Sequence, residues 1–409
     1  MGGGAAETRR QGEGRAGNLC RLACIGALLL PGFARAAQTV TIDYVTLTTP
    51  HHIPSAALDV PPTDTGLRGA ELAIADTNTT GQFTGQTYVL HRIAERDPAT
   101  LAQAYTQAIA GGTRLFITDV PAPLLLTLAD TKGAARAILL DATSEDDRLR
   151  GTDCRANTLH LLPSRAMLAD GLMQYLVTKG WTRVMLLTGR DPDDALYAAA
   201  IRHAADKFQI TIEADRPWSF NPAAQQADTG HYQVNDEVAK ATQGVSYDVL
   251  VVADEADNFG DELPYRTSTP RPVAGTQGLV PSAWAEPMDE YASTQLQLRF
   301  HRTVGRWMTS RDYGAWLAVR AIGEAATRTA SDDPAKIIAY LRGPDFTLSG
   351  YKGPELSFRH WDGQLRQPIL LADSQSLVSI SPQPGFLHQT NDLDSLGTDA
   401  PETTCHETP

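Results

Sequence analysis

Alternating apolar and polar positions divide most of the chain into strands and helices in a repeating order. The β-branched residues 39–47 predict a buried strand, and the apolar spacing of residues 66–78 predicts a helix that the polar run 77–81 ends. Further strands are expected at 87–94, 114–119, 137–141, 183–188, 211–214 and 247–253. Helices are expected at 97–110, from 121 onward, at 164–177, 191–208 and 236–242. Because strands alternate with helices in two successive runs, we expect an α/β protein with two Rossmann-like lobes, each built on a parallel sheet.

The last third of the chain has a different pattern. Residues 273–275 predict a short strand, and residues 311–327 and 333–341 predict two helices. Residues 356–359 and 368–371 are apolar runs on either side of an Asp362-Gly363 turn, and they predict a β-hairpin.

The amino terminus has the composition of an export signal. Four arginines precede the apolar run 22–30, and Ala34-Arg35-Ala36 supplies a cleavage site of small residues. The apolar run is too short to span a bilayer. We therefore expect residues 1–36 to be a signal peptide that is removed on export.

The net charge of the chain limits the classes of partner that we expect it to bind. The formal net charge is −13, and removal of residues 1–36 takes away five Arg and two Glu, which leaves −16. This acidic balance argues against binding to nucleic acid or to an anionic membrane surface.

The cysteines are consistent with one disulfide. Of the four cysteines, Cys154 and Cys405 remain after cleavage, and an even number in an oxidising compartment indicates pairing, although two unpaired thiols are the alternative. The bond would close a loop of about 250 residues, worth at most roughly 5 kcal/mol in the chain-entropy model. It would fix the carboxyl-terminal tail, residues 384–409, to the body of the protein.

No motif of a common enzyme or nucleotide-binding class is present after the signal sequence. The chain has no Walker loop, no zincin motif, no nucleophile elbow and no Cys-x-x-Cys pair. The acidic run 254–262 and the pair His51-His52 are weak metal candidates. A solvated loop is the favoured explanation for the acidic run, and adjacent histidines on a Pro-rich loop more often face different ways. We expect no enzymatic activity, no catalytic residues, no cofactor and no bound metal.

Several segments, in order, resemble type I periplasmic binding proteins of the branched-chain amino-acid ABC-transporter class. The similar segments are residues 69–85, Asp97-Pro98, 149–155, Pro163-Ser164, 180–184, 313–325 and 358–363. The resemblance implies two lobes joined by a hinge of about three crossovers. It assigns residues 37–155 and about 280–325 to lobe 1, and residues 156–279 and about 326–383 to lobe 2.

A narrower resemblance points to one branch of this class. Residues 78–81, 263–267, 270–279 and the Cys405 tail are similar to substrate-binding proteins associated with pyrroloquinoline-quinone (PQQ)-dependent alcohol dehydrogenase systems. This implies a periplasmic protein that captures a small solute linked to alcohol oxidation and delivers it to an ABC permease in the inner membrane. The alternative is an accessory protein of a quinoprotein dehydrogenase that binds PQQ, a metal ion or the enzyme itself without transport.

Candidate ligand-binding residues lie at the carboxyl ends of the predicted strands, where open parallel sheets bind ligands. They are Thr118, Asp119, Asp141, Thr143, Thr188, Arg190, Asp254 and Glu255, with Tyr265 as an aromatic candidate in the following loop. Asp119 stands where amino-acid binders of the family place a loop that holds the ligand carboxylate. A carboxylate beside Asp119 would be repelled. We therefore expect a neutral alcohol, an aldehyde, a cation or a metal-bound species rather than an ordinary α-amino acid.

Overall fold

The computed structural model describes residues 38–48, 62–218, 238–260 and 263–406. The predicted signal peptide and His51-His52 lie outside the described residues. Residues Ala37–Pro409 form one compact unit. Among the described helices, none combines the length and apolar character needed to cross a membrane.

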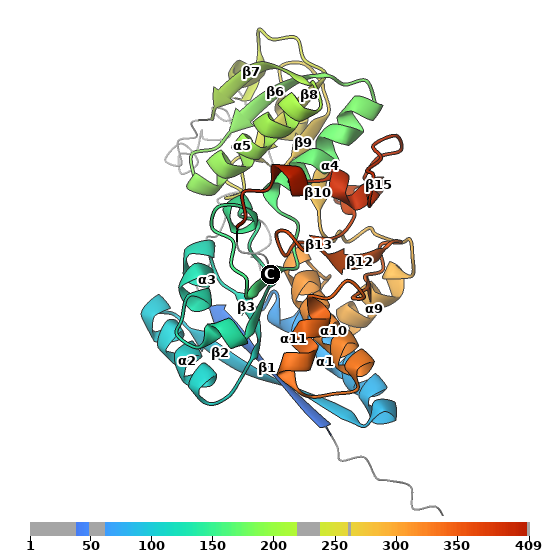
Figure 1. Cartoon of the computed structure of the whole chain (residues 1–409). Coiled ribbons are helices and arrows are strands. Elements are labelled where there is room, and N and C mark those ends of the chain that lie inside the picture. Colours follow the sequence, from blue (N-terminus) through green and yellow to red (C-terminus); the bar gives the residue numbers. More distant parts are fainter. Residues whose placement is uncertain (1–37, 49–61, 219–237, 261–262, 407–409) are drawn as a thin grey trace, which may run out of the picture. The chain divides into compact units, whose positions relative to one another are not determined.

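The first half of the chain forms a five-stranded parallel sheet in the order β2-β1-β3-β4-β5 (Figure 1). Its strands are β1 (Gln38–Leu47), β2 (Gln86–Glu95), β3 (Leu115–Asp119), β4 (Ile138–Asp141) and β5 (Thr158–His160). The helices between them are α1 (Leu67–Thr84), α2 (Pro98–Ala110) and α3 (Ala122–Ala129), with short 3-10 turns η1 (Ala134–Arg136) and η2 (Asp147–Arg150). This strand order is one of the two common doubly wound arrangements, so the predicted fold class is confirmed for this half.

Alternate side chains of each strand enter different cores. Leu115 and Ile117 of β3 pack in the cluster that includes α1 and α10 (Ser310–Thr329). Phe116, between them, packs in the cluster with α2 and α3. Figure 1 shows α10 beside α1 although about 240 residues separate them, and both cover the same face of the sheet. A strand buried on both faces carries a continuous apolar run, which is why the sequence pattern reveals it.

The second half forms a four-stranded parallel sheet in the order β7-β6-β8-β9. Its strands are β6 (Arg183–Thr188), β7 (Thr211–Pro217), β8 (Val249–Ala253) and β9 (Val273–Gly275). Its helices include α4 (Arg165–Thr178), α5 (Pro192–Lys207) and the short α8 (Leu263–Arg266). Leu186 and Val251 pack against α4 and α5, whereas Leu187 and Val252 face the opposite core. The second predicted parallel sheet is confirmed.

Two small antiparallel sheets follow. The first, β10-β14-β15, consists of β10 (Val280–Ser282), β14 (Ile369–Ala372) and β15 (Leu377–Ser381). The second, β11-β12-β13, consists of β11 (Leu348–Ser349), β12 (Glu355–Phe358) and β13 (Leu365–Arg366). The remaining elements are α9 (Ser293–Val304), α11 (Pro334–Leu341), η4 (Asp392–Ser395) and η5 (Ala400–Glu402).

Core packing divides the late segments between the two large sheets. Apolar residues of α11 and β11–β13 join the cluster of the first sheet, whereas Ile369 and Leu371 of β14 join that of the second. The expected lobe boundary places all of 326–383 in lobe 2. Lys352 links the segments that pass between the two clusters: its ammonium donates to Ala283 O (3.0 Å), Gln367 Oε1 (2.7 Å) and Pro368 O (2.8 Å).

Two local predictions are wrong. Helix α1 does not end at residues 77–81 but continues to Thr84, and Gly85 ends it with φ 72°. Asn78 does not break the helix because its side-chain amide bonds both backbone groups of Tyr88. The Asp362-Gly363 turn joins β12 to β13, not to residues 369–372. Those residues form β14, whose buried side chains pair it with β10 and β15 instead.

The predicted disulfide is present. Cys154 and Cys405 are bonded, with their Cα atoms 5.6 Å apart. Between β15 and Cys405 the tail packs on the second core through Leu396, and the Gly397 amide donates to Asp170 (2.8 Å). The tail is therefore held by the disulfide at Cys405 and by the packing of Leu396 and the hydrogen bond of Gly397.

Candidate ligand-binding site

A polar cavity of about 510 Å³ lies at the carboxyl ends of β1 and β3. Its lining comes from those strands, from β2, from the start of α1 and from the start of α10. This is the place where open parallel sheets bind ligands, because the ends of adjacent strands separate there.

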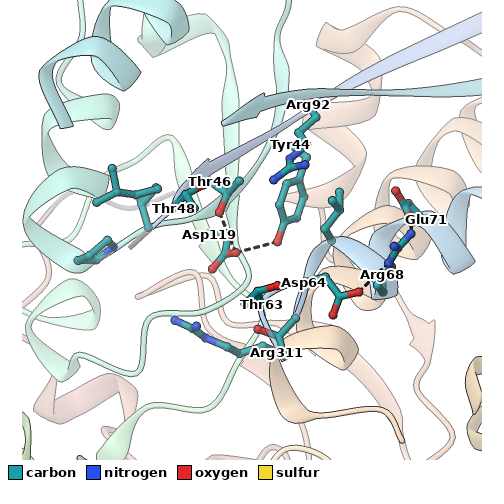
Figure 2. Close-up of a pocket in the computed structure, with 15 residues that line it drawn as sticks. Tyr44, Thr46, Thr48, Thr63, Asp64, Arg68, Glu71, Arg92, Asp119 and Arg311 are labelled. Atoms are coloured by element: carbon teal, nitrogen blue, oxygen red, sulfur yellow. Dashed lines mark hydrogen bonds and ion pairs between the residues drawn. The ribbon is translucent and has the colours of Figure 1, made fainter. Parts of the chain in front are cut away.

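Asp119 is the centre of hydrogen bonding in this cavity. Tyr44 Oη donates to its carboxylate at 2.9 Å and Thr46 Oγ1 donates at 3.1 Å. Thr46 is opposite Asp119 in the parallel register of β1 and β3, so the sheet itself brings the two side chains together. Figure 2 shows the three side chains pointing toward one another. Burial and the neighbouring carboxylate raise the pKa of the Tyr44 hydroxyl well above its usual range, so Tyr44 stays protonated and donates.

Three arginines and three carboxylates line the same cavity. Arg68 is held by Asp64 and by Glu71, each at 2.8 Å. Arg92 and Arg311 are exposed, and neither makes a hydrogen bond or ion pair with a described residue. The cavity therefore offers an acceptor, Asp119, and two cationic donors, Arg92 and Arg311, that no described residue engages.

A second cavity, of about 460 Å³, holds Asp254 and Glu255. The Asp254 carboxylate accepts from the backbone amides of Asn258 (3.0 Å), Phe259 (2.8 Å) and Gly260 (2.7 Å), so it orders its own loop. Glu255 accepts two hydrogen bonds of 2.6 Å from Arg165. Ser310 lines this cavity and Arg311 lines the first, so the start of α10 separates the two.

The other predicted residues have other surroundings. Thr118 is fully buried and its hydroxyl has no partner among the described residues, and the same is true of the nearly buried Thr188 hydroxyl. Thr143 is half-buried with an unpartnered hydroxyl. Asp141 is buried and bonds His160 Nδ1 at 2.8 Å, so it is occupied within the protein. The structure therefore brings only Asp119, Asp254 and Glu255 of the strand-end candidates into the two cavities.

Arg190 and Tyr265 are on the surface. Arg190 is exposed, and Tyr265 is 89% exposed at the edge of a third cavity, of about 800 Å³, beside β10.

Sequence reasoning missed several lining residues. Tyr44 and Arg92 lie inside strands, and Glu145, Tyr197 and Arg311 lie in a loop or on helices. A search restricted to strand ends passes over all of them. The alternation of β1 was an available signal, since Tyr44 and Thr46 share the face that Asp119 meets.

The described part of the chain contains no group of three or more His, Cys, Asp or Glu side chains arranged to hold a metal ion. In the acidic run, the Asp254 carboxylate accepts hydrogen bonds from backbone amides and so orders its own loop.

Comparison with known proteins agrees with this architecture. A family model described as periplasmic binding protein matches residues 61–233. A periplasmic binding protein from Burkholderia mallei has a TM-score of 0.63 at 16% identity, over 91% of this chain and 99% of that chain. A branched chain amino acid ABC transporter periplasmic ligand-binding protein from Burkholderia xenovorans LB400 has a TM-score of 0.64 at 16% identity, over 83% and 95%.

A solute binding protein of an ABC transporter from R. palustris, solved in complex with benzoate, has a TM-score of 0.61 at 11% identity, over 91% of this chain and 100% of that chain. No curated protein sequence matches the chain. At these identities the likeness concerns the fold, and the chain has the two-sheet α/β fold of type I periplasmic binding proteins.

Proposed function

We propose that the chain is an exported solute-binding protein that captures a small polar solute and presents it to the permease of an ABC importer. The observation that carries this proposal is the polar cavity at the carboxyl ends of β1 and β3, centred on Asp119. The matching family model and the relatives of similar fold, which include ligand-binding proteins of ABC transporters, support it.

The solute would bind by hydrogen bonding rather than by apolar burial. Asp119 already accepts from Tyr44 and Thr46, and a carboxylate oxygen retains capacity for a further donor from a solute hydroxyl or hydrated aldehyde. A solute carboxylate placed against Asp119 would be repelled. Closure of the two proposed lobes on the solute would exclude water and strengthen each polar contact.

Thermal unfolding of the purified protein against small alcohols, aldehydes, carboxylates and amino acids tests the proposal. A solute at 100 times its dissociation constant should stabilise the protein by about 2.7 kcal/mol. Asp119→Asn should abolish that shift for an alcohol. The control is Asp215→Asn on β7, where Asp215 forms an exposed ion pair with Arg202 of α5; it should leave the shift unchanged. A panel in which no solute of any class shifts the melting temperature would contradict a receptor function.

The periplasmic location, the signal peptide and the link to alcohol oxidation belong to the same proposal and rest on the sequence. Amino-terminal sequencing of protein recovered from the periplasm should give Ala37 as the first residue. An accessory role for a PQQ-dependent dehydrogenase is the competing proposal. It predicts that the purified dehydrogenase, or PQQ alone, stabilises the protein while alcohols do not.

A further inference from the structure

The carboxyl-terminal tail is fixed first to the helices of the second parallel sheet. Just before the tail begins, the Gln383 amide donates to Gln174 Oε1 of α4 at 3.0 Å. Further along, the Gly397 amide donates to Asp170 Oδ2 of α4 at 2.8 Å, and Lys207 Nζ of α5 donates to the Gly397 carbonyl at 3.0 Å. The first part of the tail is therefore attached to α4 and α5.

The same part of the tail surrounds two buried arginines of the β12–β13 hairpin. Arg359 directly follows β12, and its side chain is only 1% exposed and donates to Asp394 Oδ1 at 2.9 Å. It also donates to the Leu393 and Leu396 carbonyl oxygens at 3.0 and 2.7 Å. Arg366 of β13 donates to the same Asp394 oxygen at 2.8 Å. The tail thus supplies the acceptors for two guanidiniums of the hairpin.

This hairpin packs with the first parallel sheet. Leu356 of β12 and Leu365 of β13 are fully buried in the core cluster that contains side chains of β1, β3 and β4. In the tail, Leu396 is fully buried in the core cluster of the second sheet. Asp394, two positions before Leu396, binds the hairpin. Neighbouring tail residues are therefore attached to the structures of both sheets.

The far end of the tail is bonded beside the first sheet. Cys405 forms the disulfide with Cys154, which lies in the loop between η2 and β5. In that loop Asn157 Nδ2 donates to the Ala129 carbonyl at 3.0 Å and to the Ala134 carbonyl at 3.2 Å. The loop is thereby held against the end of α3 and against η1. The tail therefore starts on the second sheet and ends on the first.

The tail is a fourth connection between the two parallel sheets. The backbone passes from one core cluster to the other between β5 and α4, between β9 and α9, and between β13 and β14. Backbone crossings of this kind form a hinge about which two halves can rotate. A fourth connection restricts that rotation, because separation of the halves must stretch the tail or break the hydrogen bonds of Arg359.

We propose that the tail is a strap that limits how far the two proposed lobes open when no solute is bound. The eight residues that follow Gly397, up to Cys405, could span at most about 28 Å when extended. The disulfide therefore sets an outer limit on opening, and the Arg359 contacts set a closer one. The disulfide also keeps the tail at a high effective concentration near Arg359, so that broken contacts re-form. This inference rests on the two-lobed receptor of the proposed function, but on no particular solute.

Small-angle X-ray scattering of the solute-free protein, before and after reduction with dithiothreitol, tests the strap. A compact chain of this length has a radius of gyration of about 21 Å, and we expect reduction to raise the measured radius by about 1 Å or more. The circular dichroism spectrum should stay unchanged. The double variant Cys154→Ser, Cys405→Ser is the control for the reductant, and it should have the larger radius with or without dithiothreitol.

Arg359→Lys tests the closer limit. A lysine keeps the positive charge beside Asp394, but it cannot reproduce the three contacts of the planar guanidinium. The radius of the reduced variant should therefore exceed that of the reduced wild type. Arg328→Lys is the matched control, because Arg328 forms an exposed pair with Glu324 on α10, and it should leave the radius unchanged.

An unchanged radius in the reduced wild type would overturn the strap, and this measurement decides the question even where Arg359→Lys fails to fold. Hydrogen exchange that becomes faster only in residues 393–405, at constant radius, would show that the tail packs on both halves without restraining them. Scattering is measured without solute, so these outcomes leave the receptor function standing. A solute panel without any thermal shift, in contrast, contradicts the receptor function and leaves the scattering result intact.

Discussion

Arg165 and Glu255 form a two-point ion pair, with Nε and Nη2 each 2.6 Å from a different carboxylate oxygen. The Arg165 and Glu255 side chains are only 9% and 21% exposed, so solvent screens the pair little. The start of α4 is thereby fixed to the loop after β8, and residues of both line the second cavity.

Arg165→Met should destabilise the protein by about 3 kcal/mol, because it leaves Glu255 unpaired and partly buried. Urea denaturation measures the change. Arg202→Met is the matched control: Arg202 pairs with Asp215 at the same 2.6 Å, but the two side chains are 42% and 38% exposed. Its loss should cost at most about 1 kcal/mol. Equal losses for the two variants would show that burial does not strengthen the Arg165 pair.

Glu145 should make stability depend on pH. Its pKa is raised from 4.5 to about 7 by burial and Glu255, against the charges of Arg165, Arg150 and Arg311. The folded state therefore holds this proton more tightly than the unfolded state, and the stabilisation is lost as pH rises through 7.

Glu145→Gln mimics the protonated form, so it should match the wild type at pH 4 and exceed its stability by about 1 kcal/mol or more at pH 8. Melting temperatures of the wild type and of Glu145→Gln, measured from pH 4 to 9, test this difference in stability. A difference that does not change with pH would contradict the raised pKa.

Close packing of α1 on α10 depends on Gly69. A Cβ built there would lie 1.8 Å from the backbone oxygen of Asp312, which cannot move without displacing the start of α10. Gly69→Ala should cost about 3 kcal/mol, at the upper end of overpacking effects.

Gly111→Ala is the control for this change. Gly111 has φ −72°, and a Cβ there meets nothing closer than 3.4 Å. Its effect should stay within about 1 kcal/mol. Denaturation midpoints of the two variants should therefore differ clearly, and similar midpoints would show that the helices can separate at low cost.

Lys352 should contribute more to the free energy of unfolding than an exposed lysine does. Lys352→Met leaves three buried oxygen acceptors without their donor, which should cost about 2–4 kcal/mol. Lys336→Met, on the exposed side of α11, should change stability by less than about 0.5 kcal/mol. Thermal unfolding measures both variants. A Lys352→Met variant that is as stable as the wild type would show that the segments bonded by Lys352 stay together without its hydrogen bonds.

The two parallel sheets could be predicted from the sequence because their strands are buried on both faces. Residues 115–117 and 249–253 are wholly apolar runs, and helices with clear caps such as Asp97 and Ser164 separate such strands. The small antiparallel sheets were less predictable. Strand β13 has two residues, and Leu365 and Arg366 carry no periodic pattern to read. Helix α9 was missed since its apolar stripe begins after Ala292, a residue with φ 64° and no capping side chain.

The candidate site was predictable only where it lies on strand ends. Asp119 ends β3, Asp254 and Glu255 directly follow β8, and all three line cavities. Thr118 precedes Asp119 by one residue, and the two-residue period of the strand turns its side chain into the core. Tyr197 and Arg311 reach the cavities from helices, and no local pattern tells which turn of a helix faces a neighbouring loop.

The disulfide has a consequence for biosynthesis. Cys405 follows Cys154 by 251 residues, so in the proposed export its thiol would cross the membrane after the thiol with which it pairs. Until then Cys154 would be the only cysteine of the exported segment, and it would remain a thiol or form a mixed disulfide with an oxidant. The disulfide could therefore form only near the end of export, and a chain that stops short of Cys405 would carry a free thiol at Cys154.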